Sequence, residues 1–482
     1  MAERKRGDLH PRKQLVKKIV KRGLLISGIL LLAGGAFFAV FILRFVPFVS
    51  APDYPPPGDK VEAYLQDLDY LESLPRYDKS FSEGQRKTNF LDFVHNLESR
   101  IDATLSPGKF EMMVARAVAI ADNAHTNVSP EDRSARVNHL PVRFTWFKEG
   151  LFVLQATSAY RDLLGAHLDS VGGVPIDVAT KKLLPYFGGS IRRSRFYVPL
   201  TIASPQLLQA VGLSASADIA ELDFSLRNGS RVKYRIRALP EGQRQQQPRG
   251  YEMYKYGNVR EDSVAWYALK TNETPPLFLR NPQKPFDRHF LRAQNLLYLR
   301  INTCEDAGAW SLSKYLRTVI KEVETRHPKF AVVDLRFNNG GSQALSELSE
   351  SLPALLPDKG KIFVITSAET FSYGIAAAVL FKYFGHGKVL IAGEPVGDRL
   401  RFWANGGTSF ILPNSRVSLR VWSGLEDYAD GCWDWTKCFW FSPMFRRRGV
   451  GDLKPDFPVQ LSFADYANGQ DSVMEAILAT IH

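Results

Sequence analysis

Apolar and polar residues recur with two different periods along the chain, and the change of period divides it into regions. Between residues 61 and 120, apolar positions return every three or four residues, as in "VEAYLQDLDYLESL" and "KFEMMVARAVAIADNAHTN", which predicts helices. From "VRFTWFKEGLFVLQA" onward the period moves toward two, which predicts short strands, with "NGS" as a hairpin turn. We therefore expect a helical region over residues 61–140 and a β-rich region over residues 141–240.

The pattern is most regular from about residue 294 to the end. The strand-like segments "QNLLYLRIN", "KFAVVDLRF", "KIFVITS" and "KVLIAG" alternate with helix-like segments. Strict alternation of strand and helix is typical of an α/β unit with a mostly parallel sheet. We predict such a core over residues 294–482, and a linker or long excursion over the polar, Pro-rich residues 241–293.

A long apolar run lies near the N-terminus. The stretch "GLLISGILLLAGGAFFAVFIL" contains no charged residue and follows a basic tail over residues 1–22. About 20 apolar residues cross a bilayer, and basic residues stay on the cytoplasmic side. We predict a single transmembrane helix over residues 23–45 and a Pro-rich stalk over residues 46–60. A signal peptide cleaved near Ala51 is the alternative, which Pro52 and the length of the run disfavour.

Charge and cysteine content narrow the function classes. The net charge is +12, but about +7 of it lies in the tail, so the basic balance does not indicate nucleic acid as a partner. Cys432 and Cys438 are close enough for a disulfide in an exported domain, or they are two free thiols; both readings stay open. Three cysteines and scattered histidines have no zinc-site spacing, and we expect no metal or cofactor.

Two loops of the predicted core carry residues suited to acyl transfer. "NNGGS" at residues 338–342 and the loop with Ser372 both leave the carboxyl ends of successive strands, the edge where α/β sheets bind ligands. Backbone amides of Gly340 and Gly341 would then lie near the Ser372 hydroxyl and could hold an oxyanion. The alternative is that Ser372 only caps the following helix.

The combination of segments resembles the S41 serine peptidases, which include the C-terminal processing proteases, the tricorn core and the CPAF-type proteases. "VVDLRFNNGGS" resembles their Asp-Leu-Arg-x-Asn-x-Gly-Gly motif, "TSAETFSYGIAAA" their nucleophile segment and "AGEPVGD" their Gly-Glu-x-x-Gly element. "LKPDFPVQLSFADYANGQDSVMEAIL" is similar to the closing segment, and "IADNAHTNVS" to the Asp-x-His-Thr motif upstream. The resemblance spans roughly residues 60–480 and implies a ClpP/crotonase-like catalytic core.

The family uses two catalytic arrangements, and the resemblance favours the second. The Ser–Lys arrangement would need a lysine where this chain has Arg399, and arginine stays protonated, while Lys388 is out of register. The Ser–His–Glu arrangement implies Ser372 as nucleophile and His125 as base, with the amides of Gly340, Gly341 and Tyr373 as oxyanion donors. Glu426 is the carboxylate at the matching position, with Asp427 and Asp430 as rivals.

The chain also departs from the family pattern. Ile375 stands where an acidic residue is common, and Asn123-Ala124 precede His125 in place of the usual Asp-Gly. Residues 163–187 resemble part of a PDZ-like, peptide-binding module. The sequence thus predicts a serine endopeptidase anchored in the inner membrane with its catalytic domain in the periplasm, acting on polypeptides. The alternative is a catalytically inactive S41-like scaffold or peptide-binding protein of the cell envelope.

Overall fold

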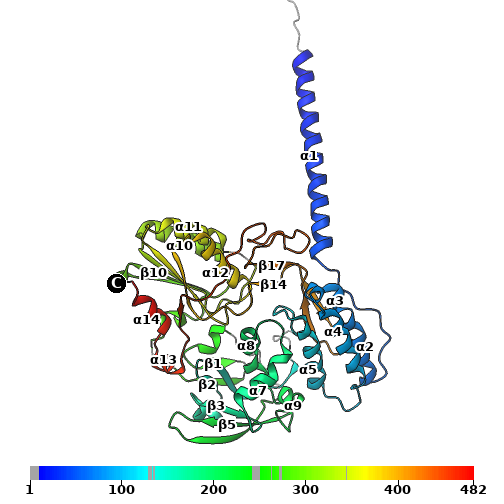
Figure 1. Ribbon diagram of the computed structural model, residues 1–482, viewed down its shortest axis with the longest axis vertical. Helices are drawn as coiled ribbons and strands as arrows, with labels where there is room; N and C mark the ends of the chain where they lie inside the picture. Colours follow the sequence, from blue (N-terminus) through cyan, green and yellow to red (C-terminus); the bar gives the residue numbers. More distant parts are fainter. Residues whose placement is uncertain are drawn as a thin grey trace, which may run out of the picture.

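One long helix stands away from three packed regions. The computed structural model describes residues 10–128, 133, 136–240, 250–261, 263–270, 274–342 and 345–481. Helix α1 (His10–Phe45) is a single rod that leaves one end of the molecule (Figure 1). Its segment Leu24–Phe45 is long and apolar enough to cross a membrane, a test that a signal sequence also passes. The helix extends into the predicted tail, whose residues 1–9 lie outside the described residues.

The helical region forms around its own apolar core. Asp59 and Ser106 each begin a helix, because their side chains accept hydrogen bonds from backbone N–H groups three residues later. A hairpin from the C-terminal half, β15 (Thr408–Ile411) and β16 (Ser418–Val421), packs into the same core. Sequence-distant segments therefore share one core. The helices are α2 (Lys60–Glu72), α3 (Leu74–Tyr77), α4 (Arg86–Glu98) and α5 (Pro107–Val118).

The β-rich region is an antiparallel sheet covered by three helices. Its strand order is β6-β5-β3-β2-β8-β7, with β1 paired to β2 and β4 paired to β3. The strands are β1 (Val142–Phe147), β2 (Gly150–Ala156), β3 (His167–Val171), β4 (Val174–Pro175), β5 (Ile219–Ser225), β6 (Arg231–Arg237), β7 (Val259–Glu261) and β8 (Val264–Ala268). The helices are α7 (Ile176–Leu183), α8 (Ile191–Ile202) and α9 (Pro205–Ala210).

The third region is a six-stranded sheet with helices on both faces (Figure 1). The order is β18-β13-β12-β11-β10-β9, and every neighbouring pair is parallel except β9 with β10. All five residues of β11 are buried, as expected for a strand covered on both sides. The strands are β9 (Phe286–Leu291), β10 (Leu296–Ile301), β11 (Phe330–Asp334), β12 (Lys361–Thr366), β13 (Val389–Gly393) and β18 (Phe457–Pro458).

Helices cover the two faces of this sheet unequally. One face packs against three helices in the largest apolar core, and the other packs against the last helix. A short pair of strands, β14 (Arg401–Trp403) and β17 (Leu425–Asp427), lies beyond β13. The helices are α10 (Leu312–Arg326), α11 (Ser346–Leu355), α12 (Tyr373–Phe384), α13 (Phe463–Asn468) and α14 (Ser472–Leu478).

The structure differs from the predicted linker at residues 241–293. Strands β7 and β8 complete the β-rich sheet, and β9 forms the edge of the core sheet. These strands are short and carry polar residues, so their pattern resembles that of a loop. The glutamine-rich part, residues 241–249, lies outside the described residues.

A buried cluster of charges ties the last helix to the core sheet. Arg336 pairs with Asp334 at 2.9 Å and reaches Asp471, before α14, through two hydrogen bonds of 3.1 and 2.9 Å. Tyr298 of β10 donates to Asp334 at 2.6 Å. Two carboxylates around one guanidinium in a buried site leave little freedom of geometry. The cluster therefore fixes the start of the loop that continues to Gly340.

Replacing Asp471 by asparagine tests this cluster. Asparagine can still cap α14 but removes one charge from a buried group, so we expect Asp471→Asn to lower the free energy of unfolding by about 3 kcal/mol. The matched control is Asp452→Asn, which removes an exposed partner of Lys382 and should cost less than about 1 kcal/mol. Urea unfolding followed by tryptophan fluorescence measures both. Equal losses in the two variants would contradict a stabilising role for the cluster.

Candidate active site

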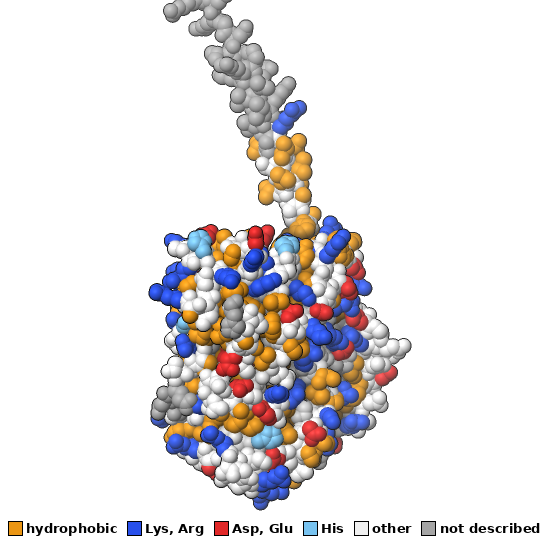
Figure 2. Space-filling view, turned by 60° about the vertical axis from the view of Figure 1, so that its left-hand side comes forward, with side chains coloured by type: hydrophobic (Ala, Val, Ile, Leu, Met, Phe, Trp, Pro, Cys, Tyr) orange, Lys and Arg blue, Asp and Glu red, His pale blue; other side chains and the backbone are white. Residues whose placement is uncertain are grey.

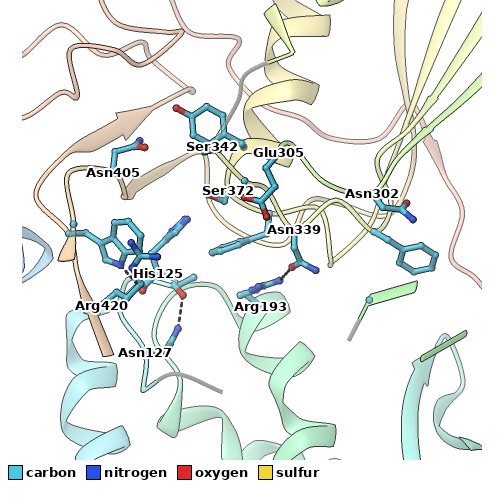
Figure 3. Close-up of a pocket in the computed structure, with 18 of the residues that line it drawn as sticks. His125, Asn127, Arg193, Asn302, Glu305, Asn339, Ser342, Ser372, Asn405 and Arg420 are labelled. Atoms are coloured by element: carbon cyan, nitrogen blue, oxygen red, sulfur yellow. Dashed lines mark hydrogen bonds between the residues drawn. The ribbon is translucent and has the colours of Figure 1, made fainter. Parts of the chain in front are cut away.

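All three regions contribute side chains to one large cavity. It has a volume of about 1250 Å³ and lies at the carboxyl ends of the core strands (Figure 3). Ser372 and Gly341 come from the core, His125 from the helical region and Arg193 from the β-rich region. Two of the predicted catalytic residues, Ser372 and His125, therefore line the same cavity although 247 positions separate them in the chain.

Ser372 occupies a strained turn between β12 and α12. Its φ and ψ are +53° and −124°, in a region that residues other than glycine rarely adopt. The hydrogen bonds of its neighbours hold this turn: Phe371 donates to the Asn338 carbonyl at 2.9 Å, and Gly374 donates to the Phe371 carbonyl at 2.8 Å. Within the described residues, the Ser372 hydroxyl makes no capping hydrogen bond. The geometry thus presents the hydroxyl to the cavity and disfavours the capping alternative.

The glycine loop approaches Ser372 more closely than any side chain would allow. Gly340 and Gly341 have φ values of +101° and +146°. A Cβ on Gly340 would lie 2.7 Å from the Ser372 Cβ, and one on Gly341 would lie 2.6 Å from the Cys304 carbonyl. Both positions therefore require glycine for conformation and for space. The predicted closeness of this loop to Ser372 is present in the structure.

One predicted oxyanion donor is already engaged. The Gly340 amide donates to the Asn338 side chain at 2.9 Å, so in this conformation it is not free for a ligand. Asn338 in turn donates to the Ile301 carbonyl at 2.9 Å, which fixes it in place. The Asn338 side chain thus competes with a bound ligand for the Gly340 amide. The amides of Gly341 and Tyr373 are left as the predicted donors, and Tyr373 is the first residue of α12, where the helix dipole is positive.

Residues on either side of His125 fix its segment against β14. The Asn123 side chain donates to the Trp403 carbonyl at 2.8 Å and accepts from the Trp403 amide at 3.2 Å. Thr126 donates to the buried Asp78 at 2.8 Å, and the Trp422 indole donates to the His125 carbonyl at 2.7 Å. The Asn123 that departs from the family pattern is therefore the residue that joins the helical region to the core.

The His125 imidazole lies in an aromatic stack. Its ring centroid is 4.3 Å from that of Phe371 and 4.9 Å from that of Phe402, and both rings are stacked on it. Neither ring nitrogen has a hydrogen-bond partner among the described residues. Burial, with Arg193 and Arg420 nearby, lowers the pKa of His125 to about 3. The imidazole is therefore neutral at physiological pH, as a base must be, but it makes no hydrogen bond to Ser372 in this arrangement.

Glu426 is buried behind the cavity wall. It accepts from the Asn405 amide at 2.6 Å and from the Ser442 hydroxyl, and Asn405 itself lines the cavity. Burial raises the pKa of Glu426 to about 7, opposed by its hydrogen bonds to Ser442, Tyr428 and Asn405. Glu426 is opposite Phe402 in the β14–β17 pair, and Phe402 stacks on His125. Glu426 and His125 are thus both neighbours of Phe402, with no hydrogen bond between them.

The other candidates lie elsewhere. Asp427 follows Glu426 on the strand, so it faces the opposite side, where Arg401 pairs with it at 3.4 Å. Asp430 donates its amide to the Asp427 side chain at 3.0 Å. Arg399 pairs with Asp122 at 2.7 Å, and Lys388 donates to the Pro353 and Leu356 carbonyls. Over the described part of the chain, no three His, Cys, Asp or Glu side chains gather as metal ligands would.

Sequence reasoning missed two polar residues of the cavity. Arg193 of α8 donates to the Asn339 side chain at 2.8 Å, and its guanidinium lies 3.9 Å from the centre of the Phe371 ring. Asn405 connects the cavity to Glu426. No local pattern marks either residue, since the first is one of several arginines on a helix and the second is a turn residue with φ of +64°.

Solved structures provide the comparison for this fold. No protein-family model and no curated protein sequence matches the chain. Mature CPAF matches with a TM-score of 0.53 at 11% identity, covering 87% of this chain and 96% of its own. Mature CPAF complexed with lactacystin matches with a TM-score of 0.52 at 11% identity, over 87% and 98% of the two chains. The predicted S41 resemblance is therefore confirmed at the level of the fold: this chain has the fold of CPAF.

Proposed function

We propose that this protein is a membrane-anchored serine endopeptidase of the S41 type that cleaves polypeptides on the exported, periplasmic side of the inner membrane. The observation that carries the proposal is the shared cavity. A serine at positive φ, a glycine loop within contact of it and a neutral histidine from a distant region line one space, in a chain with the CPAF fold. A neutral imidazole and a serine hydroxyl in one cavity suit general-base catalysis once the two are brought together.

Each residue has one role in the proposed acyl transfer. The Ser372 oxygen attacks the substrate carbonyl carbon while His125 takes the hydroxyl proton, and the amides of Gly341 and Tyr373 stabilise the oxyanion. The imidazolium then gives its proton to the leaving amine as the peptide bond breaks. In the second half, His125 takes a proton from water, the water oxygen attacks the acyl-enzyme carbonyl, and the carboxylic acid leaves as the Ser372 oxygen regains a proton from His125. Each oxyanion donor typically lowers the barrier by about 3–4 kcal/mol.

His125 must move before it can act. Its ring lies between Phe371 and Phe402, where an imidazolium would be costly because neighbouring Arg193 and Arg420 are also positive. A change of side-chain rotamer that turns the ring toward Ser372 would also bring it to a polar part of the cavity wall. The structure corresponds to a resting arrangement in this proposal, and substrate binding favours the turned rotamer.

Glu426 is the carboxylate that this proposal assigns to His125. Its position opposite Phe402 puts it on the face that His125 contacts, whereas Asp427 is on the other face. Asn405, which contacts Glu426 and lines the cavity, lies where it can be displaced when the ring turns. An ionised Glu426 would then hold the imidazole tautomer and stabilise the imidazolium.

The anchor and the β-rich region complete the proposal. The apolar segment Leu24–Phe45 follows a tail rich in Lys and Arg, which favours a cytoplasmic N-terminus and an exported catalytic domain. A PDZ-like peptide-binding role for the β-rich region stays a prediction. It is supported by the position of that region, since its Arg193 enters the cavity.

A fluorophosphonate probe tests the nucleophile. We expect the probe to label the full-length protein and to spare Ser372→Ala, because only an activated serine forms the adduct, and we expect peptide hydrolysis to fall at least about 10⁴-fold. Ser342→Ala is the matched control, because Ser342 lines the same cavity. It should keep labelling. A wild-type protein that stays unlabelled, also after limited proteolysis, would favour the inactive scaffold.

The pH profile tests Glu426. Because burial raises its pKa to about 7, Glu426 carries a proton below pH 7 and cannot accept from the imidazole, so kcat/KM should rise about tenfold per unit up to pH 7 and then level. His125, with its pKa near 3, adds no step in this range. Glu426→Gln should lower kcat/KM by about 10³-fold and remove the step near pH 7.

Asp427→Asn is the control for this profile. The two carboxylates are adjacent in sequence but face opposite sides of β17, so Asp427→Asn should keep the step near pH 7. A step that survives in Glu426→Gln, or disappears in Asp427→Asn, would reassign the carboxylate.

A further inference from the structure

An aromatic loop packs along the membrane anchor. The segment from Cys432 to Phe441, here called the aromatic loop, is closed by a disulfide between Cys432 and Cys438. Ring centroids of Trp440 and Phe37 are 5.3 Å apart, and those of Phe441 and Phe41 are 4.9 Å apart. Further contacts join Phe45 to Phe439 and Trp440. The contacts follow one face of α1 at intervals of four residues, so the loop lies lengthwise against the helix.

The end of α1 is also fixed to the domain. Phe45 is fully buried, and its carbonyl accepts a hydrogen bond from the Ser423 hydroxyl at 2.5 Å. Gly406 leaves room for this contact, since a Cβ there would lie 2.4 Å from the Phe45 carbonyl oxygen. The anchor therefore meets the domain at a packed junction, and the position of the domain relative to the membrane follows from the position of α1 (Figure 1).

The length of the apolar helix sets the depth of the loop. Leu24–Phe45 has 22 residues and is about 33 Å long, close to the roughly 30 Å of hydrocarbon in a bilayer. Phe37 lies eight residues, or about 12 Å, before Phe45. A bilayer that covers this helix therefore reaches Phe37 and the Trp440 ring packed on it.

The exposed residues of the loop suit this position. Trp433, Trp435 and Phe441 have 57%, 58% and 61% of their surface exposed, an unusual exposure for such large apolar side chains. Tryptophan is enriched where a membrane meets water. Arg446, Arg447 and Arg448 follow the loop and are exposed, which suits anionic headgroups. Figure 2 shows apolar side chains continuing from α1 to the domain, with Lys and Arg around this end.

The cavity of the candidate active site extends to the same place. Its lining includes Val46, directly after the anchor, and Phe439 and Phe441 of the aromatic loop, as well as Ser372 and His125. One continuous space therefore joins the catalytic residues to the base of the membrane helix. A polypeptide that lies on the membrane, or leaves it, would enter this space directly.

We propose that the aromatic loop enters the membrane interface and holds the cavity against the bilayer, so that the substrates are segments of membrane-embedded or lipid-attached proteins close to the membrane surface. The proposed substrate class rests on the proposed peptidase function, whereas the insertion of the loop does not. The two are tested by separate measurements on the full-length protein.

Quenching of tryptophan fluorescence tests the insertion. The full chain is reconstituted in vesicles of phosphatidylcholine and phosphatidylglycerol, with or without bromine on the acyl chains. We expect the double variant Trp433→Ser/Trp435→Ser to lose at least half of the quenched emission. Trp146→Phe is the control, because Trp146 is in β1, away from α1 (Figure 1), and its loss should leave the quenched emission unchanged. Equal quenching in the wild type and the double variant would overturn the insertion.

Cleavage of one peptide in two forms tests the substrate class. The peptide is presented free in solution and attached to a diacyl lipid in the same vesicles. We expect the wild type to prefer the attached form at least tenfold in kcat/KM, and the double serine variant to lose that preference while cleaving the free peptide within twofold of wild type. Trp433→Phe/Trp435→Phe, which keeps two apolar rings, should retain the preference, so that its loss in the serine variant is assigned to the missing rings.

The outcomes separate the two proposals. Quenching without cleavage of either peptide would support the insertion and overturn the peptidase function and the substrate class that rests on it. Cleavage of both forms at equal rates by the wild type would overturn the substrate class alone. Absent quenching together with a concentration-dependent dimer in detergent would assign the aromatic surface to a second copy and overturn the membrane contact.

Discussion

The pairing of Asn123 with the backbone of Trp403 is the constraint on which the candidate site depends. One amide side chain forms two hydrogen bonds to a short strand that follows it by 280 residues. His125 is two residues further on, so this pairing decides which face of the core the imidazole meets. The β15–β16 hairpin, buried in the helical core, makes the same connection by apolar packing. The helical region is therefore part of the proposed catalytic unit, because it carries His125 and is held by residues of the core.

The electrostatics of the cavity follow from the burial of His125 and Glu426. The Phe371 ring stacks on the His125 imidazole, and the Arg193 guanidinium lies 3.9 Å from the centre of the same ring, so one ring contacts both the imidazole and a permanent cation. Burial favours the uncharged forms of both His125 and Glu426. A resting site without a charged imidazole or a fully ionised carboxylate avoids the cost of two buried charges. In the proposed mechanism, the ion pair between His125 and Glu426 forms only during the reaction with a substrate. In the proposed mechanism, such a resting site would react slowly without substrate, and the peptidase would therefore not cleave its own chain.

The sequence predicted the parts of the fold whose pattern is set locally. Strands β10 to β13 are apolar runs, of which β10 and β11 are buried throughout, and the helices between them have clear periodicity. Strand β9 was missed because only one neighbour pairs with it and its residues are half polar. Within the site, the close approach of Gly340 and Gly341 to Ser372 was predictable, because paired glycines indicate an unusual backbone conformation. The hydrogen bond from the Gly340 amide to the Asn338 side chain was not predictable, because it depends on a side-chain rotamer. Arg193 and Asn405 reach the cavity through tertiary packing alone, which no spacing in the sequence encodes.

The position of the cavity bears on how such an enzyme would select its substrates. A space of about 1250 Å³ with walls from three regions is too large to fit one side chain closely, so discrimination by a narrow specificity pocket is limited. Fixing the opening beside the anchor restricts substrates in another way, because a polypeptide tethered to the same bilayer has a high effective concentration at that opening. The packed Phe45–Ser423 junction keeps this geometry constant, since a flexible stalk at that point would let the cavity turn toward bulk solvent. Selection by location thus depends on the rigidity of a few residues between the membrane helix and the domain.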